Sequence, residues 1–142
     1  MTRKLDVNAR TEITKVGLAA VEGGRLLVVR KRGKPSFILP GGKPEAGEDE
    51  LSALVRELDE ELGCSLTRPA YEGRFADKAA DLPGTDVVVV LYSGSLDGRP
   101  APRAEIEEMV WVDVVTPGIL RLAPSITNMI LPYLRRRLEA RV

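Results

Sequence analysis

Residues 41–64 of the chain read "GGKPEAGEDELSALVRELDEELGC", and they combine a helical pattern with an unusual density of negative charge. The apolar positions that recur at helical spacing are Leu51, Leu54, Val55, Leu58 and Leu62. This spacing predicts an amphipathic helix that begins near Asp49, ends before Gly63 and anchors its apolar face in a core. After Lys43 the stretch holds eight carboxylates against one cation, Arg56. Because like charges on a helix repel one another, the excess requires a reason other than stability.

Three of the carboxylates lie on one side of the predicted helix. Glu57, Glu60 and Glu61 are related by three- and four-residue steps, so they project from neighbouring positions. A solvated helix face is the simple alternative, but such faces usually mix charges of both signs. The helix also follows Pro40-Gly41-Gly42, a turn whose backbone can approach a ligand closely. Clustered carboxylates beside backbone oxygens are typical of a site for Mg²⁺ or Mn²⁺, which would also relieve the repulsion.

The composition narrows the chemistry that the chain can perform. Its 142 residues contain 21 cationic and 21 acidic side chains, so no overall field attracts a nucleic-acid polymer or an anionic membrane. The absence of histidine excludes a Ser-His-Asp triad, a His-Cys zinc site and imidazole catalysis, and leaves acid–base chemistry chiefly to carboxylates. The single cysteine, Cys64, is predicted to be a small buried hydrophobe and fits a reducing cytoplasm. The first ten residues lack the apolar core of a secretory signal, which also favours a cytoplasmic location.

The remaining pattern predicts one mixed α/β or α+β domain over residues 1–142, with a loose lead-in at residues 1–10. The expected elements are two strands within 12–32 joined at Gly23–Gly24, a short strand within 37–43, one or two strands in 65–79, strands at 85–96 and 109–115, and a final helix within 123–140. Ser125 is the expected N-cap of that helix, and Pro132 predicts a kink or restart. The cluster at 135–137 is interpreted as solvated charge near the helix end.

The stretch that follows Gly41 resembles the Nudix box, the signature of the Nudix hydrolases: G-x5-E-x7-R-E-U-x-E-E-x-G-U, with U a bulky aliphatic residue. The matching positions are Gly42, Glu48, Arg56, Glu57, Leu58, Glu60, Glu61, Leu62 and Gly63, with Cys64 in the last aliphatic position as a mild departure. Looser agreement extends over about 110 residues, through "LLVV" before "LPGG" and "EIEEMVWV" after it. The resemblance implies a Nudix fold, in which a mixed sheet lies between helices in an α/β/α sandwich. It also implies hydrolysis of a diphosphate bond in a nucleoside diphosphate linked to another moiety.

The same resemblance implies roles for individual residues. Glu57, Glu60 and Glu61 match the family's metal ligands, and the Gly42 carbonyl is a further candidate. Arg56 and Glu48 match positions that steady the loop and helix, where a salt bridge between them would orient Glu57.

The chemistry of a diphosphate leads to the same glutamates. Divalent cations must bridge the acidic site and the anionic substrate, and a carboxylate must then take the proton of the attacking water. Glu61 is our first choice for this base, followed by Glu60 and Glu57, and mutual repulsion is expected to raise their pKa values without metal. In some members of the family a loop glutamate before a late strand is a ligand or base. The candidates here, which the sequence does not separate, are Glu105, Glu107 and Glu108.

Substrate contacts require cations for phosphate and a surface for the base. The cationic candidates near the glycine turn are Arg30, Lys31, Arg32, Lys34 and Lys43, each of which could instead be a solvated strand-end charge. Phe37 and Phe75 are the candidate stacking rings, whereas Trp111 is expected in the core or on a sheet face.

Three classes of function remain to be compared. The complete set of glutamates favours a Mg²⁺- or Mn²⁺-dependent diphosphohydrolase acting on a small nucleotide, such as a nucleoside triphosphate, ADP-ribose, a dinucleoside polyphosphate or a nucleotide sugar. A catalytically silent Nudix-fold module that binds or senses a nucleotide is the alternative. Isomerase chemistry on an allylic diphosphate is disfavoured because Cys64 is the only thiol. An exposed edge strand would also allow a homodimer.

Overall fold

A computed structural model of the chain describes residues 10–140, so nearly all of the expected lead-in lies outside the described residues. The strands and helices in chain order are β1 (Thr11–Ala19), β2 (Val21–Glu22), β3 (Arg25–Lys31), β4 (Gly41–Gly42), α1 (Glu50–Leu62), β5 (Ser65–Lys78), β6 (Thr85–Asp97), β7 (Ile106–Asp113), the π-helical turn η1 (Ile126–Ile130) and α2 (Leu131–Glu139). Within this range no helix is both long and apolar enough to cross a membrane.

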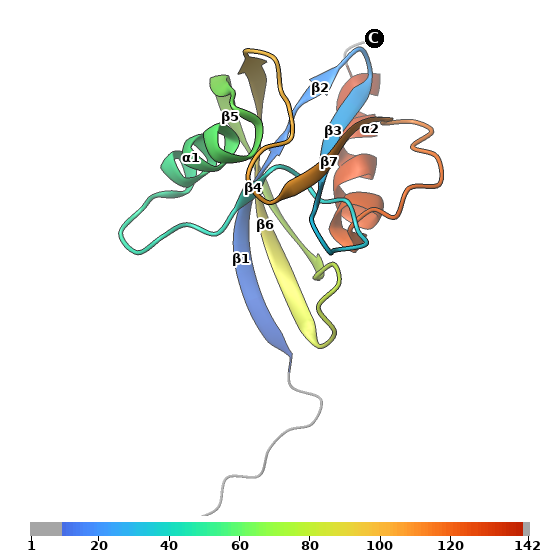
Figure 1. The fold of residues 1–142 in the computed structure, drawn as a ribbon. Coiled ribbons are helices and arrows are strands. Elements are labelled where there is room, and N and C mark those ends of the chain that lie inside the picture. Colours follow the sequence, from blue (N-terminus) through green and yellow to red (C-terminus); the bar gives the residue numbers. More distant parts are fainter. Residues whose placement is uncertain (1–9, 141–142) are drawn as a thin grey trace, which may run out of the picture.

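The strands form two sheets. One has the order β4-β1-β6-β5, in which β1 and β6 are parallel and the other pairs are antiparallel. The other has the order β2-β3-β7 and is antiparallel. Gly23 and Gly24, with φ of 56° and 75°, form the predicted turn, but it joins β3 to the two-residue β2. The two long strands that flank the turn therefore belong to different sheets (Figure 1).

The helices cover opposite sides of the sheets, which confirms the predicted α+β class and sandwich arrangement (Figure 1). Side chains alternate along β3, because successive residues of a strand point to opposite faces. Leu27 and Val29 pack in the cluster that contains the buried side of α1, whereas Leu26 and Val28 pack in the cluster that contains α2. The sheets thus hold α1 at a fixed place, and α1 carries the candidate glutamates.

Helix α1 agrees closely with its sequence pattern. The Asp49 carboxylate accepts a hydrogen bond from the Ser52 N–H at 2.7 Å, and Gly63 ends the helix with φ of 68°. The side chains on its buried face include Ala53, Leu54, Leu58 and Leu62. Val55 is 45% exposed, so its predicted place in the core is wrong: it lies one position past Leu54 and turns away from the sheets. Cys64 is buried with a free thiol, as predicted, and burial raises its pKa.

The C-terminal helical segment differs from its prediction at the start. Ser125 stands at the predicted N-cap position of the first turn, but it has helical backbone angles and its side chain makes no capping hydrogen bond. The chain first forms the π-helical turn η1, in which the Leu131 N–H donates to the Ile126 carbonyl. Pro132 follows in the first turn of α2 and cannot donate a backbone bond, which explains the predicted restart.

Two arginines of α2 contact residues that are distant in the sequence. Arg135 donates through Nε to the Val114 carbonyl at 2.8 Å, and Arg137 pairs with Glu72 and donates to the Tyr133 hydroxyl. Arg136 and Arg137 are exposed in the last turn of α2, in agreement with the interpretation as solvated charge near the helix end, whereas Arg135 is half-buried. Packing of α2 against the sheets brings distant acceptors within reach of Arg135 and Arg137.

Candidate active site

The two glycines of β4 place the glycine turn directly between β1 and α1. Gly41 and Gly42 pair with Gly17 and Val16 of β1. A Cβ atom on Gly41 would lie 2.0 Å from the Val16 carbonyl oxygen, and one on Gly42 would lie 2.7 Å from the carboxyl carbon of Glu57. A side chain is therefore excluded at Gly41, where it would meet backbone, and one at Gly42 would displace the Glu57 carboxylate that lies against it.

Glu61 points inward and is 2% exposed. Its Oε1 accepts a hydrogen bond from the Gly41 N–H at 2.9 Å, while its Oε2 is buried and has no partner among the described residues. Burial is the main reason that its pKa rises to about 7, and the charge of Glu57 adds to this, whereas the Gly41 bond and Lys31 act in the opposite direction. Glu61 thus has the raised pKa that we expected, but burial outweighs repulsion as its cause. A buried carboxylate oxygen without a donor requires a proton or a cation.

Arg56 organises the outer glutamates and makes the predicted salt bridge. Its Nε and Nη2 atoms donate to the two carboxylate oxygens of Glu48 at 2.8 and 2.9 Å. Its Nη1 donates to Glu57 at 2.9 Å and reaches Glu60 at 3.4 Å. The hydrogen bonds from Arg56 are the main reason that the pKa of Glu48 falls to about 2. Arg56 therefore relieves part of the repulsion among these carboxylates, which the sequence analysis expected a divalent cation to relieve. It also holds Glu57 in place.

The three candidate metal-binding glutamates of α1 have different surroundings. The side chain of Glu57 is 16% exposed and that of Glu60 is 53% exposed, whereas Glu61 is buried. No group of three acidic, histidine or cysteine side chains within residues 10–140 is already arranged to hold an ion. Glu57 and Glu60 turn toward Arg56, and this explains why the cluster is not assembled. Even so, the unpartnered Glu61 Oε2 and the close approach of Gly42 to Glu57 provide hard oxygen donors that fit a divalent cation.

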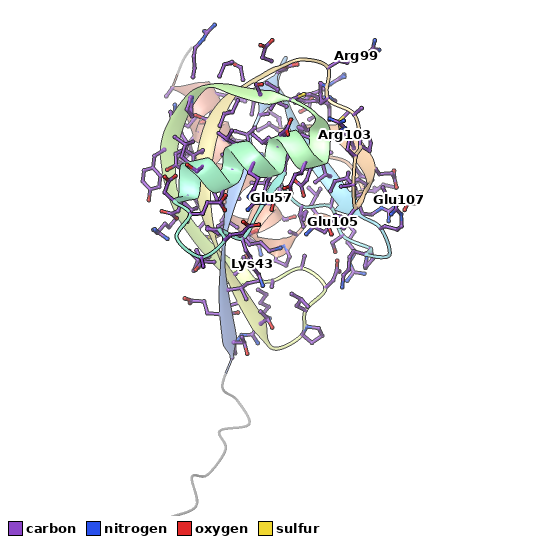
Figure 2. The ribbon with its side chains drawn as sticks, turned by 60° about the vertical axis from the view of Figure 1, so that its left-hand side comes forward. Lys43, Glu57, Arg99, Arg103, Glu105 and Glu107 are labelled. Atoms are coloured by element: carbon purple, nitrogen blue, oxygen red, sulfur yellow. The ribbon has the colours of Figure 1, made fainter. Side chains whose placement is uncertain are left out.

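A cavity of about 410 Å³ begins beside these glutamates and extends along β1. Its charged and polar lining comprises Lys15, Lys31, Lys34, Lys43, Glu57, Glu105, Asp81, Ser36 and Ser125. In Figure 2, Glu57 lies at the lower side of α1, with Lys43 below it and Glu105 below and to the right of it. The cavity therefore combines an acidic end with a wall of lysines, a combination suited to a phosphate chain bridged by a cation.

The structure separates the cations that follow one another along β3. Lys31 lines the cavity, where its ammonium pairs with Glu105 at 3.2 Å. Arg30 instead pairs with Glu108 at 2.7 Å, and Arg32 pairs with Glu107 at 3.4 Å. None of these last four residues lines the cavity.

The positions of these side chains relative to the cavity bear on several predicted site residues. Arg30, Arg32 and Glu108 do not line this cavity and pair with one another or with Glu107 instead, so their predicted roles in binding substrate or metal stay predictions. Glu105 is the one of the three loop glutamates that lines the cavity.

The predicted stacking rings do not line the cavity either. Phe37 is 5% exposed and belongs to the core cluster beneath α2, and Phe75 packs against Tyr133 with ring centres 5.2 Å apart. The apolar end of the cavity is lined, among the described residues, by aliphatic side chains: Ile13, Val16, Ile38, Leu39, Ala79, Ala80, Leu82, Val87, Val89, Ala123 and Ile126. Trp111 packs against the α1 cluster as expected. A base in this end would contact aliphatic walls and not an aromatic face.

Two charged residues that line the cavity were not predicted from the sequence. Lys15 has a signal in the alternation of β1, because it shares a face with Ile13 and Gly17. Asp81 has no such signal in the sequence, because its position depends on its contact with Ser36, which lies in a loop 45 residues away. Its carboxylate accepts hydrogen bonds from the Ser36 N–H at 3.1 Å and the Ser36 hydroxyl at 2.8 Å.

Comparisons with known proteins identify the family and the fold. Residues 14–130 match the family model described as the NUDIX domain. A Mycobacterium tuberculosis protein named "Putative 8-oxo-dGTP diphosphatase 2" is 34% identical over 124 residues, which cover 78% of this chain and 87% of that protein. The crystal structure of a MutT NUDIX hydrolase from Burkholderia pseudomallei is 26% identical, with a TM-score of 0.66 over 78% of this chain and 90% of its own. The fold also matches a MutT protein from Methanosarcina mazei, with a TM-score of 0.74 at 21% identity over 90% and 96% of the two chains.

Proposed function

This chain belongs to the Nudix hydrolase family, and we propose that it uses Mg²⁺ or Mn²⁺ to hydrolyse a diphosphate bond in a nucleoside 5′-triphosphate. One observation carries the proposal: Glu61, which accepts a hydrogen bond from the Gly41 N–H, has a buried Oε2 without a partner among the described residues. The adjoining Gly42 meets Glu57, and Glu57 lines the lysine-rich cavity. The M. tuberculosis relative is named for 8-oxo-dGTP, so oxidised deoxynucleoside triphosphates are the first substrates to test.

The chain supplies donors for the cation from two elements. Glu57 and Glu60 of α1, with the Gly42 carbonyl of β4, would hold it, and Glu61 would either complete this set or act as the base. A divalent cation bound there would neutralise phosphate charge and lower the pKa of its bound water. Arg56 would keep Glu57 oriented through its bonds to Glu48 and Glu57.

We propose Glu61 as the general base. Its Oε2 has no hydrogen-bond donor among the described residues and is therefore free to accept the proton of the attacking water. Its pKa of about 7, raised mainly by burial, lies near neutral pH, where a base is most effective. On the opposite wall, Lys31 and Lys43 would bind phosphate oxygens, and Glu105 would position Lys31.

A substrate panel with Mg²⁺ or Mn²⁺ tests the proposal. It should contain the four deoxynucleoside triphosphates, 8-oxo-dGTP, ADP-ribose and a nucleotide sugar, with mononucleotide and phosphate or pyrophosphate measured as products. We expect turnover of triphosphates that disappears with EDTA and falls by about 100-fold or more in E57Q and E60Q, while the melting temperature stays near that of the wild type.

The panel also distinguishes the enzyme from the sensor module. Thermal stabilisation by a nucleotide, without metal-dependent turnover of any compound in the panel, would support the sensor and contradict the proposed reaction. Turnover that survives unchanged in both glutamine variants would leave the reaction standing but contradict the roles assigned to these glutamates.

A further inference from the structure

Lys15 is a charged side chain in the middle of the cavity for which the proposed reaction has no use so far. It lies on β1 between Ile13 and Gly17, on the strand face that lines the cavity, and is partly buried. Within residues 10–140 no carboxylate oxygen lies within 4 Å of its ammonium group. Lys31, by contrast, has Glu105 as its partner in the same cavity.

The surroundings of Lys15 make its charge costly in the free protein. Burial lowers the pKa of Lys15, and the nearby charges of Lys31 and Lys43 lower it further, whereas Glu61 and Glu105 raise it from a distance. A partly desolvated cation without a paired anion is unfavourable. Its aliphatic neighbours Ile13 and Val89 would tolerate an apolar side chain equally well. The position of this lysine therefore indicates an anionic ligand.

The strand register places Lys15 between the two ends of the cavity. Val16, the next residue of β1, pairs with Gly42, so Lys15 adjoins the turn that meets Glu57. Ile13 pairs with Val87, and both line the aliphatic end. Since a strand advances about 3.3 Å per residue, Lys15 lies about 7 Å from Ile13 along β1. A substrate with its nucleoside at the aliphatic end and its diphosphate at the glutamates would pass Lys15 at the phosphate next to the nucleoside.

We propose that Lys15 forms a subsite for the 5′-phosphate of the nucleotide, on the nucleoside side of the bond that is cleaved; the inference rests on the proposed diphosphohydrolase function. Lys31 and Lys43 then serve the phosphates nearer to the cation. This subsite selects compounds that carry a nucleoside 5′-monophosphate group, and it retains the mononucleotide product more strongly than the phosphate or pyrophosphate product.

Binding measurements on K15M test this subsite, with K78M as the matched control at an exposed position near the end of β5. Calorimetric titrations with Mg²⁺ should use deoxyguanosine 5′-monophosphate and inorganic pyrophosphate separately. We expect K15M to weaken mononucleotide binding by about 10- to 100-fold, the range for a lost charged hydrogen bond, and to change pyrophosphate binding by less than about 3-fold. The melting temperature of ligand-free K15M should equal or exceed that of the wild type, because an unpaired charge is removed. K78M should match the wild type in all three measurements.

Several results would overturn the assignment. The first is an unchanged mononucleotide affinity in K15M, and the second is an equal weakening of mononucleotide and pyrophosphate binding. The third is that the wild type does not bind the mononucleotide at millimolar concentration. A fall in melting temperature with unchanged affinities would make Lys15 a structural residue. Because these titrations require no turnover, they remain decisive if the wild type hydrolyses nothing, which would contradict the proposed function and not the subsite.

Discussion

The side chains of Glu61 and Glu72 are both largely shielded from solvent, and their surroundings are opposite. Glu61 on α1 is 2% exposed, with one oxygen bonded to the Gly41 N–H and the other without a partner in the described part of the chain. The side chain of Glu72 on β5 is 6% exposed, yet it accepts hydrogen bonds from the Ser93 and Tyr133 hydroxyls and pairs with Arg137.

The difference shows that nearby hydrogen-bond donors, and not burial alone, decide the pKa of a buried carboxylate. Burial raises the pKa of both groups, but at Glu72 the hydrogen bonds from Ser93 and Tyr133 and the charge of Arg137 reverse the effect and lower it. Glu72 consequently joins β5, β6 and α2 as a structural tie. Glu61 keeps an oxygen available for a ligand or a proton.

The largest expected effect comes from E61Q. The amide oxygen of glutamine can still accept the Gly41 bond, but the side chain can no longer act as a base, so kcat should fall by about 100-fold or more while the fold is retained. Steady-state kinetics with the best substrate of the panel measure this, and E72Q serves as the matched control with a kcat near that of the wild type.

The same variant separates the two roles proposed for Glu61. Unchanged Mg²⁺ affinity in E61Q, measured calorimetrically, supports the base, whereas a loss of affinity in proportion to kcat identifies a metal ligand. A kcat close to that of the wild type would contradict both roles.

The pH dependence of stability in EDTA should also distinguish the two glutamates. The pKa of Glu61 is about 7 in the folded protein against 4.5 as its ordinary value, so the folded state holds the proton more tightly between these values. The contribution of Glu61 is therefore fully present below about pH 4.5 and is lost as the pH rises through 7, a change on the order of 3 kcal/mol. The pKa of Glu72 is lowered, so its contribution to stability has the opposite pH dependence. That contribution is present above pH 4.5 and is lost in acid.

Urea denaturation from about pH 2.5 to 8 measures both contributions, because the loss at Glu72 occurs below its ordinary pKa. E61Q should remove the decline toward neutral pH, and E72Q should weaken the decline in acid. The same neutral-pH decline in E61Q as in the wild type would show that another group is responsible for it.

E72Q should lower stability and leave catalysis intact. It deprives Arg137 and the two hydroxyl groups of a charged acceptor, and the expected loss is about 1–3 kcal/mol in the free energy of unfolding at pH 7. Urea denaturation at this pH measures the loss. An equally stable E72Q variant would mean that the tie between the strands and α2 contributes nothing measurable.

The smallest effect concerns Arg56, which orients Glu57 much as Arg137 holds Glu72. R56K keeps the charge but cannot make the forked contact with Glu48 while also reaching Glu57, so we expect kcat/KM to fall by about 10-fold. R74K, which changes an exposed arginine paired with Glu50, is the control and should match the wild type. Equal kinetics in R56K and R74K would show that the forked contact does not matter.

Much of α1 could be predicted because its signals are local. The apolar spacing, Asp49 and Gly63 act within a few residues of one another, and the structure confirms the bounds of the helix to within one residue. Val55 was misplaced because only the packing of α1 against the sheets decides how wide its buried face is. Phe37 was misplaced for the same kind of reason, since its ring enters the cluster beneath α2.

The sequence by itself determined the family, the acidic helix and the salt bridge between Arg56 and Glu48, because these depend on spacing along one short segment. Only the tertiary structure decided that Glu61 is buried with an unpartnered oxygen and that Glu105, and not Glu108, lines the cavity. It also decided that Lys15 has no anionic partner in the described part of the chain. Burial and pairing depend on which strands meet across the molecule, and no local pattern of residues records those contacts.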